Sequence, residues 1–364
     1  MRKYLKNKIS IIIPTFNEAE NIVKLIEQII LEIEHKNFEI FVVDDGSSDQ
    51  TVQNIFSNFE NEQRVKVIQR EHDKGLLQSI KFALQSINGE FFLVMDGDGQ
   101  HSAKDMIKLI NNLKDNDLVI GSRDLNKTKS IKPVRIFFSK IFNFILKFVL
   151  SVKLRDPLTG FFAGRINLLN RKFFLLNTSG FKILLDLLFC NKNQNIKISE
   201  EIIDFKERIA GSSKLNLQIV FSFVTQVLSY FTNGLISSKF IGFVMIGSIG
   251  LIVHFAILFN CLNLLNFSFI LSHAMATILS ASFNFILNNY LNFVNNEITE
   301  PKLFIKSLFK YYLVNIPGIL LSISGASFVY DLILKNVFIA SLSGAILDAV
   351  FKYAISTTWI WRSK

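Results

Sequence analysis

The segment Phe91-Phe92-Leu93-Val94-Met95-Asp96-Gly97-Asp98-Gly99-Gln100-His101 decides the fold of the first half of the chain. Its first five residues carry no polar side chain, which is typical of a β-strand covered on both faces. Two carboxylates, Asp96 and Asp98, follow at once with one glycine between them. Mg²⁺ and Mn²⁺ prefer oxygen ligands and commonly take one or two carboxylates together with substrate phosphates. The segment therefore predicts a buried strand that ends at a site for a divalent cation, although a solvated turn explains most isolated Asp-x-Asp pairs.

Strand-like and helix-like patterns alternate on both sides of this segment. Short apolar runs predict strands at residues 10–14, 38–43, 64–69, 91–95 and 118–120. Apolar residues at helical spacing predict helices at residues 21–33, 76–84 and 102–114. This alternation predicts a Rossmann-like α/β sandwich with a mostly parallel sheet. In such sheets ligands bind beyond the carboxyl ends of the strands, where this chain places its acidic residues.

Two further acidic motifs follow predicted strands. In Val43-Asp44-Asp45-Gly46-Ser47-Ser48-Asp49, the paired acids suit hydrogen bonds to a base and a ribose, and the alternative is a turn with a helix N-cap. In Pro14-Thr15-Phe16-Asn17-Glu18, the glutamate is either a ligand contact or a charge at a helix N-terminus.

The second half of the chain is far more apolar. Residues 131–150 and 217–235 carry narrow polar stripes on wide apolar faces, which predicts helices that lie in a membrane interface, with ordinary core helices as the alternative. Residues 240–262, 267–290, 308–328 and 337–359 are each long and apolar enough to cross a bilayer, which predicts an all-α four-helix transmembrane domain. Residues 283–293 and 351–361 end the two helix pairs with similar patterns, which suggests a repeat.

Charge indicates the orientation and the partners. Lysines in the 295–310 loop and basic residues at the C-terminus predict that both face the cytosol, as does the N-terminal domain, whose apolar run at residues 9–13 is too short for a signal peptide. The net charge is +10, and basic residues flank apolar segments. This favours anionic lipid and a phosphorylated substrate over nucleic acid. The two cysteines, Cys190 and Cys261, have no metal-ligand spacing.

Seven motifs in order carry a resemblance to a known family. They are residues 14–21, 43–51, 74–75, 96–101, Gly121-Ser122-Arg123, Asp156-Pro157-Leu158-Thr159-Gly160-Phe161 and Arg208-Ile209-Ala210-Gly211-Ser212-Ser213-Lys214. Together they resemble glycosyltransferase family 2, in its dolichol-phosphate mannosyltransferase and bactoprenol glucosyltransferase branch. Residues 240–250 and 284–293 resemble a GtrA-type membrane domain. The resemblance implies a catalytic domain of glycosyltransferase A fold at residues 1–130 and 151–214, interface helices at 131–150 and 215–236, and a GtrA-like domain of four spans at 237–364.

The resemblance also implies roles for individual residues. Mg²⁺ or Mn²⁺ would be held by Asp96, Asp98 and Gln100. The nucleotide-sugar would be contacted by Pro14, Phe16, Glu18, Asp44, Asp45, Asp96, Gly97, Asp98, Arg208 and Lys214. The acceptor phosphate would be held by Arg123 and Arg135, for which snorkelling at the membrane surface is the alternative in the case of Arg135. Asp156 would orient an arginine or touch the sugar, or would be a turn acid before Pro157.

The implied reaction is the inverting transfer of a hexose onto a polyprenyl phosphate, dolichyl or undecaprenyl, at the cytosolic membrane face. The donor is expected to be GDP-mannose, with UDP-glucose next, and a homo-oligomer through the transmembrane domain is compatible with this arrangement. Two alternatives differ in class. A processive polysaccharide synthase would need a Gln-x-x-Arg-Trp motif, which the sequence lacks. A non-catalytic transporter or scaffold for lipid-linked sugars would not need the intact Asp96, Asp98, Arg123 and Arg208.

Overall fold

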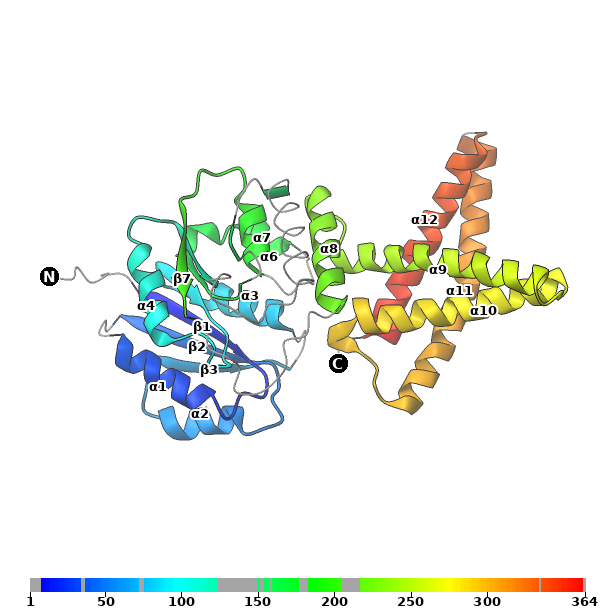
Figure 1. Cartoon of the computed structure of the whole chain (residues 1–364). Helices are drawn as coiled ribbons and strands as arrows, with labels where there is room; N and C mark the ends of the chain where they lie inside the picture. The colour runs from blue at the N-terminus through cyan, green and yellow to red at the C-terminus, as the bar shows by residue number, and fades with distance from the viewer. Residues whose placement is uncertain are drawn as a thin grey trace. The chain divides into compact units, whose positions relative to one another are not determined.

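The computed structural model describes residues 8–33, 37–71, 75–123, 149–150, 154–156, 159–176, 183–204, 217–333 and 335–362. The chain divides into two compact units (Figure 1). The first comprises Met1–Asn216 with Tyr230–Leu235, and the second comprises Leu217–Ser229 with Ile236–Lys364. The predicted helix at residues 131–150 lies almost wholly outside the described residues.

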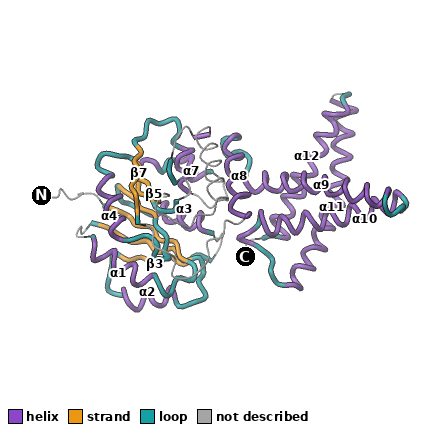
Figure 2. The backbone as a smooth tube through the Cα atoms, in the orientation of Figure 1, coloured by secondary structure: helices purple, strands orange, loops and turns teal. Residues whose placement is uncertain are grey.

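The first unit is built on a seven-stranded sheet in the order β3-β2-β1-β4-β6-β5-β7 (Figure 2). Its strands are β1 Ile9–Thr15, β2 Phe38–Asp44, β3 Val65–Gln69, β4 Phe91–Val94, β5 Leu118–Arg123, β6 Phe162–Arg165 and β7 Ile198–Ile203. Strand β6 runs antiparallel to both of its neighbours, β4 and β5. All other neighbouring strands are parallel, which confirms the predicted sheet. The carboxyl ends of six strands and the amino end of β6 therefore meet at one edge.

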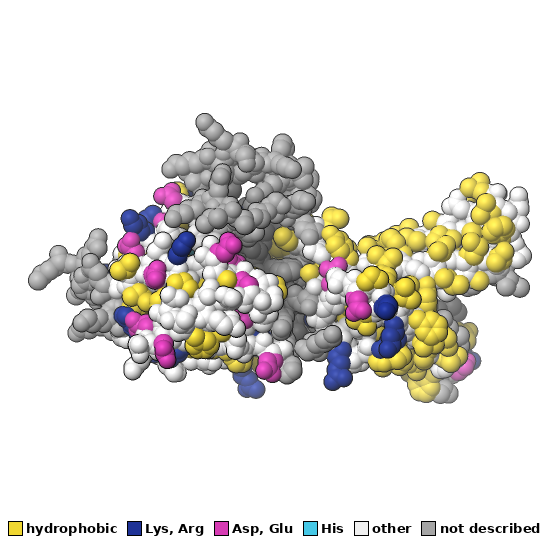
Figure 3. Space-filling model, turned by 90° about the horizontal axis from the view of Figure 1, so that it is seen from below, with side chains coloured by type: hydrophobic (Ala, Val, Ile, Leu, Met, Phe, Trp, Pro, Cys, Tyr) yellow, Lys and Arg dark blue, Asp and Glu magenta, His cyan; other side chains and the backbone are white. Residues whose placement is uncertain are grey.

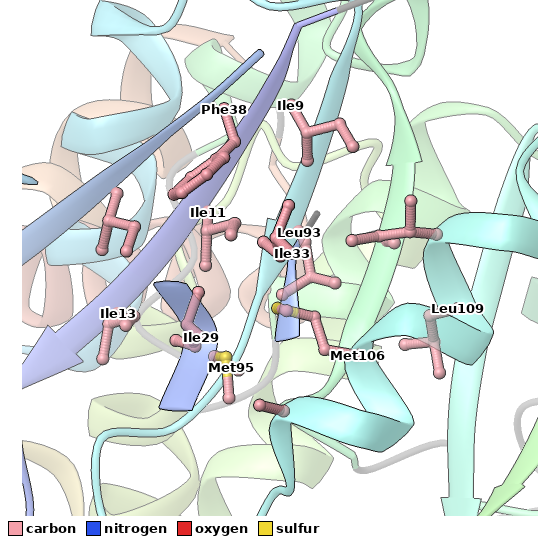
Figure 4. Close-up of a cluster of buried hydrophobic side chains, with 14 of the residues drawn as sticks. Ile9, Ile11, Ile13, Ile29, Ile33, Phe38, Leu93, Met95, Met106 and Leu109 are labelled. Carbon is pink, nitrogen blue, oxygen red and sulfur yellow. The ribbon is translucent and has the colours of Figure 1, made fainter. Parts of the chain in front are cut away.

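Helices cover both faces of this sheet. They are α1 Ile22–Glu32, α2 Thr51–Phe59, α3 Leu76–Ser86, α4 Ala103–Asn112, α6 Arg171–Leu175 and α7 Ile183–Cys190. Alternate residues of β1 (Ile9, Ile11 and Ile13) pack with side chains of α1, α2 and α4 into one hydrophobic core (Figure 4). Ile12, between them, is buried on the opposite face, and α3 packs against β1 and β2. Burial on both faces explains why β4 contains no polar residue and why β1 and β2 are mostly apolar.

One buried polar cluster ties helices of this unit together. The carboxylate of Asp186 on α7 is fully buried and accepts a hydrogen bond of 2.7 Å from the hydroxyl of Tyr230. Lys81 on α3 lies 3.2 Å from the other carboxylate oxygen and donates to the carbonyl of Leu176 at 2.9 Å. A buried charge persists only when it is paired and hydrogen-bonded. The aromatic ring of Tyr230 also stacks on Phe189.

The second unit is helical. Its main elements are α8 Leu217–Phe231, of which Leu217–Ser229 belongs to this unit, α9 Ser238–Asn263, α10 Phe269–Leu287, α11 Pro301–Phe328 and α12 Val337–Ile355. Helices therefore lie where the sequence predicts the second interface helix and the four spans. Within the described residues, α9 alone is long and apolar enough to cross a membrane by length and composition. Hydrophobic side chains cover much of the visible surface of this unit (Figure 3). Among the exposed large hydrophobic residues of α9 are Ile252, Phe255 and Phe259.

The two helix pairs of this unit repeat one structural pattern. Helices α10 and α12 each end in a single π-helical turn, Asn288–Asn292 and Ser356–Ile360. The next residue is Phe293 in one case and Trp361 in the other, with nearly the same backbone angles, φ −108° and −103° and ψ 39° in both. The two rings stack with centroids 4.4 Å apart. This finding supports the repeat predicted from the sequence.

The repeat also relates the glycines at which the helices of each pair approach one another. Gly318 follows Gly250 by as many residues as Trp361 follows Phe293. A Cβ atom on Gly250 of α9 would lie 2.0 Å from the amide oxygen of Asn284 on α10. A Cβ atom on Gly318 of α11 would lie 2.3 Å from Asp348 and 2.7 Å from Lys352 on α12. In both pairs a polar side chain of the second helix fills the space that the absent side chain leaves.

This contact yields a matched pair of substitutions. Gly250→Ala must displace Asn284, so we expect a loss of about 1–3 kcal/mol in stability from overpacking. Gly247→Ala, one turn earlier on α9, meets no atom within 4 Å. Alanine favours a helix by about 1 kcal/mol over glycine, so this control should be neutral or stabilising. Thermal unfolding in detergent should separate the two variants, and equal midpoints would contradict the contact.

Candidate active site

The acidic motifs predicted to hold ligands meet at the edge where the parallel strands end. Residues 16–21 follow β1, residues 45–50 follow β2 and residues 95–102 follow β4, while Arg123 is the last residue of β5. The turn that precedes the antiparallel β6 reaches the same edge. The structure thus places the predicted site residues at this edge of the sheet, as expected for an α/β fold. They are Pro14, Glu18, Asp45, Asp96 and Arg123.

Side-chain hydrogen bonds join the loops after β1 and β2. Asn17 adopts a left-handed backbone conformation with φ 57°, which asparagine tolerates better than most residues. Its side-chain oxygen accepts the backbone N–H of Ser48 at 2.9 Å. Asp49 in turn accepts the backbone N–H of Ala19 at 3.0 Å. Burial raises the pKa of Asp49, but hydrogen bonds from Thr51 and Ala19 outweigh that effect and lower it. The two loops consequently form one wall.

Asp44 shapes the turn after β2. Its carboxylate is fully buried and accepts the backbone N–H groups of Gly46 and Ser47, both at 2.9 Å, as well as both neighbouring hydroxyls, those of Ser47 and Thr15. Gly46 has φ 82°, a conformation that favours glycine. This geometry matches the turn alternative for Asp44, and its contact with a nucleotide stays a prediction.

Asp45 joins the loop after β2 to the segments around β3 and α3. One carboxylate oxygen accepts from Arg70 at 2.9 Å and from the hydroxyl of Ser79 at 2.6 Å. The other accepts the backbone N–H of Gly75 at 2.7 Å. The side chains of Asp45 and Arg70 are only 12% and 8% exposed, so this ion pair is well shielded. Phe16, by contrast, is 61% exposed at the end of β1 and is free of such packing.

The predicted metal motif is held by two glycines. Gly97 lies against the end of β1, because a Cβ atom there would come within 3.1 Å of Thr15. Gly160 lies against the carboxylate of Asp96, since a Cβ atom would lie 3.0 and 3.1 Å from its two oxygens. One oxygen of Asp98 accepts the backbone N–H of Gln100 at 3.0 Å.

His101 packs directly beneath this motif. It is 3% exposed, and its ring stacks on Phe161 with centroids 4.6 Å apart and an angle of 12°. Its Nδ1 atom accepts the backbone N–H of Asp96 at 3.3 Å and lies 3.9 Å from a carboxylate oxygen of Asp96. Burial lowers the pKa of His101, against the opposing effects of the Asp96 and Asp98 charges. Because Nδ1 accepts the N–H of Asp96, it carries no proton in this arrangement, which is the neutral form of the imidazole.

Arg123 and Asp156 form a two-point ion pair beside the metal motif. The Nε atom of Arg123 lies 2.6 Å from one oxygen of Asp156, and its Nη2 atom lies 3.2 Å from the other. Asp156 is 6% exposed, whereas the Arg123 side chain is 28% exposed. The backbone carbonyl of Asp156 accepts the backbone N–H of Thr159 at 3.3 Å, and the next residue, Gly160, lies against the carboxylate of Asp96. The pair thus lies next to the predicted metal motif, with the Arg123 side chain partly exposed.

The donor set suits a hard divalent cation. Within the described ranges, no group of three or more His, Cys, Asp or Glu side chains is arranged to hold a metal ion. Asp96 and Asp98 nevertheless offer carboxylate oxygens at the site, and Mg²⁺ typically takes one or two carboxylates with the rest of its shell from water and substrate phosphates. The residues present therefore fit such an ion. Gln100 is buried, and its role as a ligand stays a prediction.

Other site residues lie beyond what the structure describes or were not recognised in the sequence. Arg135, Arg208 and Lys214 lie outside the described residues, so their predicted phosphate contacts stay predictions. No motif in the sequence indicates Arg70 or Ser79 as partners of Asp45. Gly160 belongs to one of the motifs that carry the family resemblance, and only that resemblance indicated in advance that it lies at the site.

Comparison with known proteins identifies the class. Residues 10–173 match glycosyl transferase family 2, and residues 242–361 match the GtrA/DPMS transmembrane domain. The dolichol-phosphate mannosyltransferase of Pyrococcus furiosus is 30% identical over 364 residues, which cover 98% of this chain and 100% of that protein. The chain therefore belongs to glycosyltransferase family 2 and joins its catalytic domain to a GtrA/DPMS membrane domain. It is a membrane glycosyltransferase.

Further relatives match about 60% of the chain. The Saccharomyces cerevisiae dolichol-phosphate mannosyltransferase is 25% identical over 233 residues, which cover 60% of this chain and 85% of that protein. A dolichyl-phosphate beta-glucosyltransferase of Trichomonas vaginalis is 24% identical over 235 residues, which cover 58% and 72%. The crystal structure of glucosyl-3-phosphoglycerate synthase from Mycobacterium tuberculosis gives a TM-score of 0.47 at 16% identity, covering 61% of this chain and 80% of that chain.

The shielding of the Asp45–Arg70 pair predicts its contribution to stability. Removing one partner of a buried ion pair leaves an uncompensated charge, so Asp45→Asn should lower the free energy of unfolding by about 3–5 kcal/mol. The matched control is Glu62→Gln, which breaks a more exposed pair with Arg64 and should cost at most about 1 kcal/mol. Thermal unfolding of both variants tests this difference. Similar midpoints for the two variants would mean that the stability of the fold does not depend on pairing the charge of Arg70 with Asp45.

Proposed function

We propose that the protein transfers a hexose from a nucleotide-sugar to a polyprenyl phosphate, with inversion at the sugar. The observation that carries this proposal is the Arg123–Asp156 pair beside Asp96 and Asp98. It offers a cation for an acceptor phosphate next to carboxylates suited to a metal ion and a diphosphate. Relatives named as dolichol-phosphate mannosyltransferases and a dolichyl-phosphate glucosyltransferase support the acceptor class.

An acceptor phosphate needs no catalytic base. Its second pKa is about 6, so it is largely dianionic at neutral pH and is already a nucleophile. A free carboxylate beside it would repel it. Asp156 instead accepts both hydrogen bonds from Arg123, which fixes the plane of the guanidinium. Arg123 can then align the phosphate opposite the leaving group and screen its charge.

Asp96 and Asp98 would hold a Mg²⁺ or Mn²⁺ ion at the carboxyl end of β4. When bound, such an ion neutralises the negative charge of the departing nucleoside diphosphate. Gly160 keeps the carboxylate of Asp96 in place, and the short link through Gly97 keeps Asp98 close to it. We assign the contacts with the nucleotide to residues on and beside the wall formed by the loops after β1 and β2, namely Pro14, Phe16, Glu18 and Asp45. We assign the contacts with the diphosphate to Arg208 and Lys214.

The donor follows less directly from the site. GDP-mannose is the proposed donor because most of the relatives described above are mannosyltransferases, and UDP-glucose is the second candidate because one is a glucosyltransferase. The acceptor lipid implies a site near a membrane. We propose that α8 lies in the interface, that α9 to α12 cross the bilayer, and that the catalytic unit and both termini are cytosolic.

Metal dependence tests the central assignment. Asp98→Asn removes a carboxylate charge that matters when the ion and the diphosphate are bound, so transfer should be abolished while the thermal midpoint stays near that of the wild type. Asp115→Asn, an exposed carboxylate in the turn after α4, is the matched control and should keep full activity. Mass spectrometry of the lipid product, with a panel of nucleotide-sugars and with excess EDTA, is the measurement. Wild-type turnover in EDTA would refute metal use.

The acceptor site is tested separately by kinetics. A hydrogen bond to a charged group is worth about 1.5–3 kcal/mol, so Arg123→Ala should reduce the efficiency of acceptor use by about tenfold to a hundredfold. Arg123→Lys should rescue little, since lysine cannot make a two-point contact. Asp156→Asn should reduce acceptor use without affecting nucleotide-sugar binding, because it loosens Arg123.

Arg165→Ala provides the control for these variants. Arg165 pairs with Glu90 and Asp117 at the opposite edge of the sheet and should leave acceptor kinetics unchanged. If Arg123→Ala instead abolished nucleotide-sugar binding while acceptor kinetics stayed normal, Arg123 would belong to the donor site.

A further inference from the structure

His101 makes contacts that packing alone does not require. A histidine that only fills a core needs apolar neighbours and any polar partner for its ring nitrogens. Here the ring contacts two segments that are far apart in the sequence. Phe161, from the turn before β6, stacks on its face, and the backbone N–H of Asp96, from the turn after β4, donates to its Nδ1 atom.

These contacts fix Asp96 from two sides. Nδ1 of His101 holds the main-chain N–H of Asp96 at 3.3 Å, and the Cα atom of Gly160 backs the carboxylate. Gly160 and Phe161 are consecutive, so one turn supports both the imidazole and the carboxylate. The backbone of that turn is itself anchored, because Gly121 on β5 donates its N–H to the carbonyl of Phe161 at 2.9 Å. The main chain and the side chain of Asp96 therefore share one rigid support.

We propose that His101 is a positioning residue for the divalent cation, which acts by holding the main chain of Asp96 so that its carboxylate faces the ion together with that of Asp98. This inference rests on the proposed function, since it presumes that Asp96 and Asp98 bind the ion. Residues that orient a metal ligand without touching the metal commonly contribute tenfold to a hundredfold to metal affinity. The imidazole is too deeply buried to contact a substrate directly.

Two substitutions separate the hydrogen bond from the packing. His101→Phe keeps an aromatic ring of similar size on Phe161 but replaces the Nδ1 acceptor with a C–H group. His101→Asn loses the stacking but places its side-chain oxygen where Nδ1 lies, so that it can accept the N–H of Asp96. Gly164→Ala, in β6 and away from the site, is a control for general destabilisation, since a Cβ atom there would meet the ring of Phe92 at 2.8 Å.

The experiment measures Mn²⁺ binding to the full-length protein in detergent by electron paramagnetic resonance, with a saturating nucleoside diphosphate present, because substrate phosphates complete the shell of such an ion. We expect His101→Phe to bind Mn²⁺ about tenfold to a hundredfold more weakly than the wild type. His101→Asn should recover part of that loss, and Gly164→Ala should bind normally although it melts earlier. Asp98→Asn is the reference for loss of the site.

Each outcome has a definite meaning. If His101→Phe binds Mn²⁺ as the wild type does while Asp98→Asn does not, the metal site stands and His101 has no positioning role. If His101→Asn is as weak as His101→Phe, or if Gly164→Ala loses as much affinity, the Nδ1 hydrogen bond is not the cause and the inference is wrong. If Asp98→Asn itself binds normally, the metal assignment in the proposed function fails instead.

Discussion

The site depends on the single antiparallel strand of the sheet. Because β6 runs against β4 and β5, its amino end arrives at the edge where those strands finish. The turn that leads into β6 therefore lies at the edge where the acidic motifs meet. It supplies Asp156 to Arg123 at the end of β5, Gly160 to Asp96 after β4, and Phe161 to His101. In an all-parallel sheet no strand would begin at this edge, so the turn that carries Asp156, Gly160 and Phe161 would not reach it.

The elements that were predicted correctly share one property, which is that their signal is local. Strand β4 is a continuous apolar run, β1 and β2 are mostly apolar, and α1 and α4 carry apolar residues at helical spacing, so each is visible without knowledge of its neighbours. Strand β6 is only four residues long and contains a glycine, and β7 has two adjacent glutamates. Both owe their conformation to pairing with β5, a distant segment whose partnership no local pattern reveals.

The same distinction applies to the site. That acidic residues follow strands, and that strand ends meet at one edge, could be predicted from the order of the motifs. The individual tasks of the carboxylates could not, because these depend on partners contributed by other elements. Asp45 is bound by Arg70 and Ser79, and Asp156 is bound by Arg123. His101 stood in the quoted motif, yet its role became visible only through Phe161, sixty positions later along the chain.

The joined loops after β1 and β2 have a consequence for the energetics of donor binding. The hydrogen bonds between Asn17, Ser48, Asp49 and Ala19 join groups of the protein itself, so the order that they impose on this wall does not depend on a nucleotide. A binding surface that must become ordered on contact loses affinity to the entropy of that ordering. In this protein the entropy of ordering these loops is lost during folding rather than on binding. If the donor binds here, as we propose, the exposed ring of Phe16 meets it from a preformed wall, and the binding energy of the donor can be used to align the sugar for transfer.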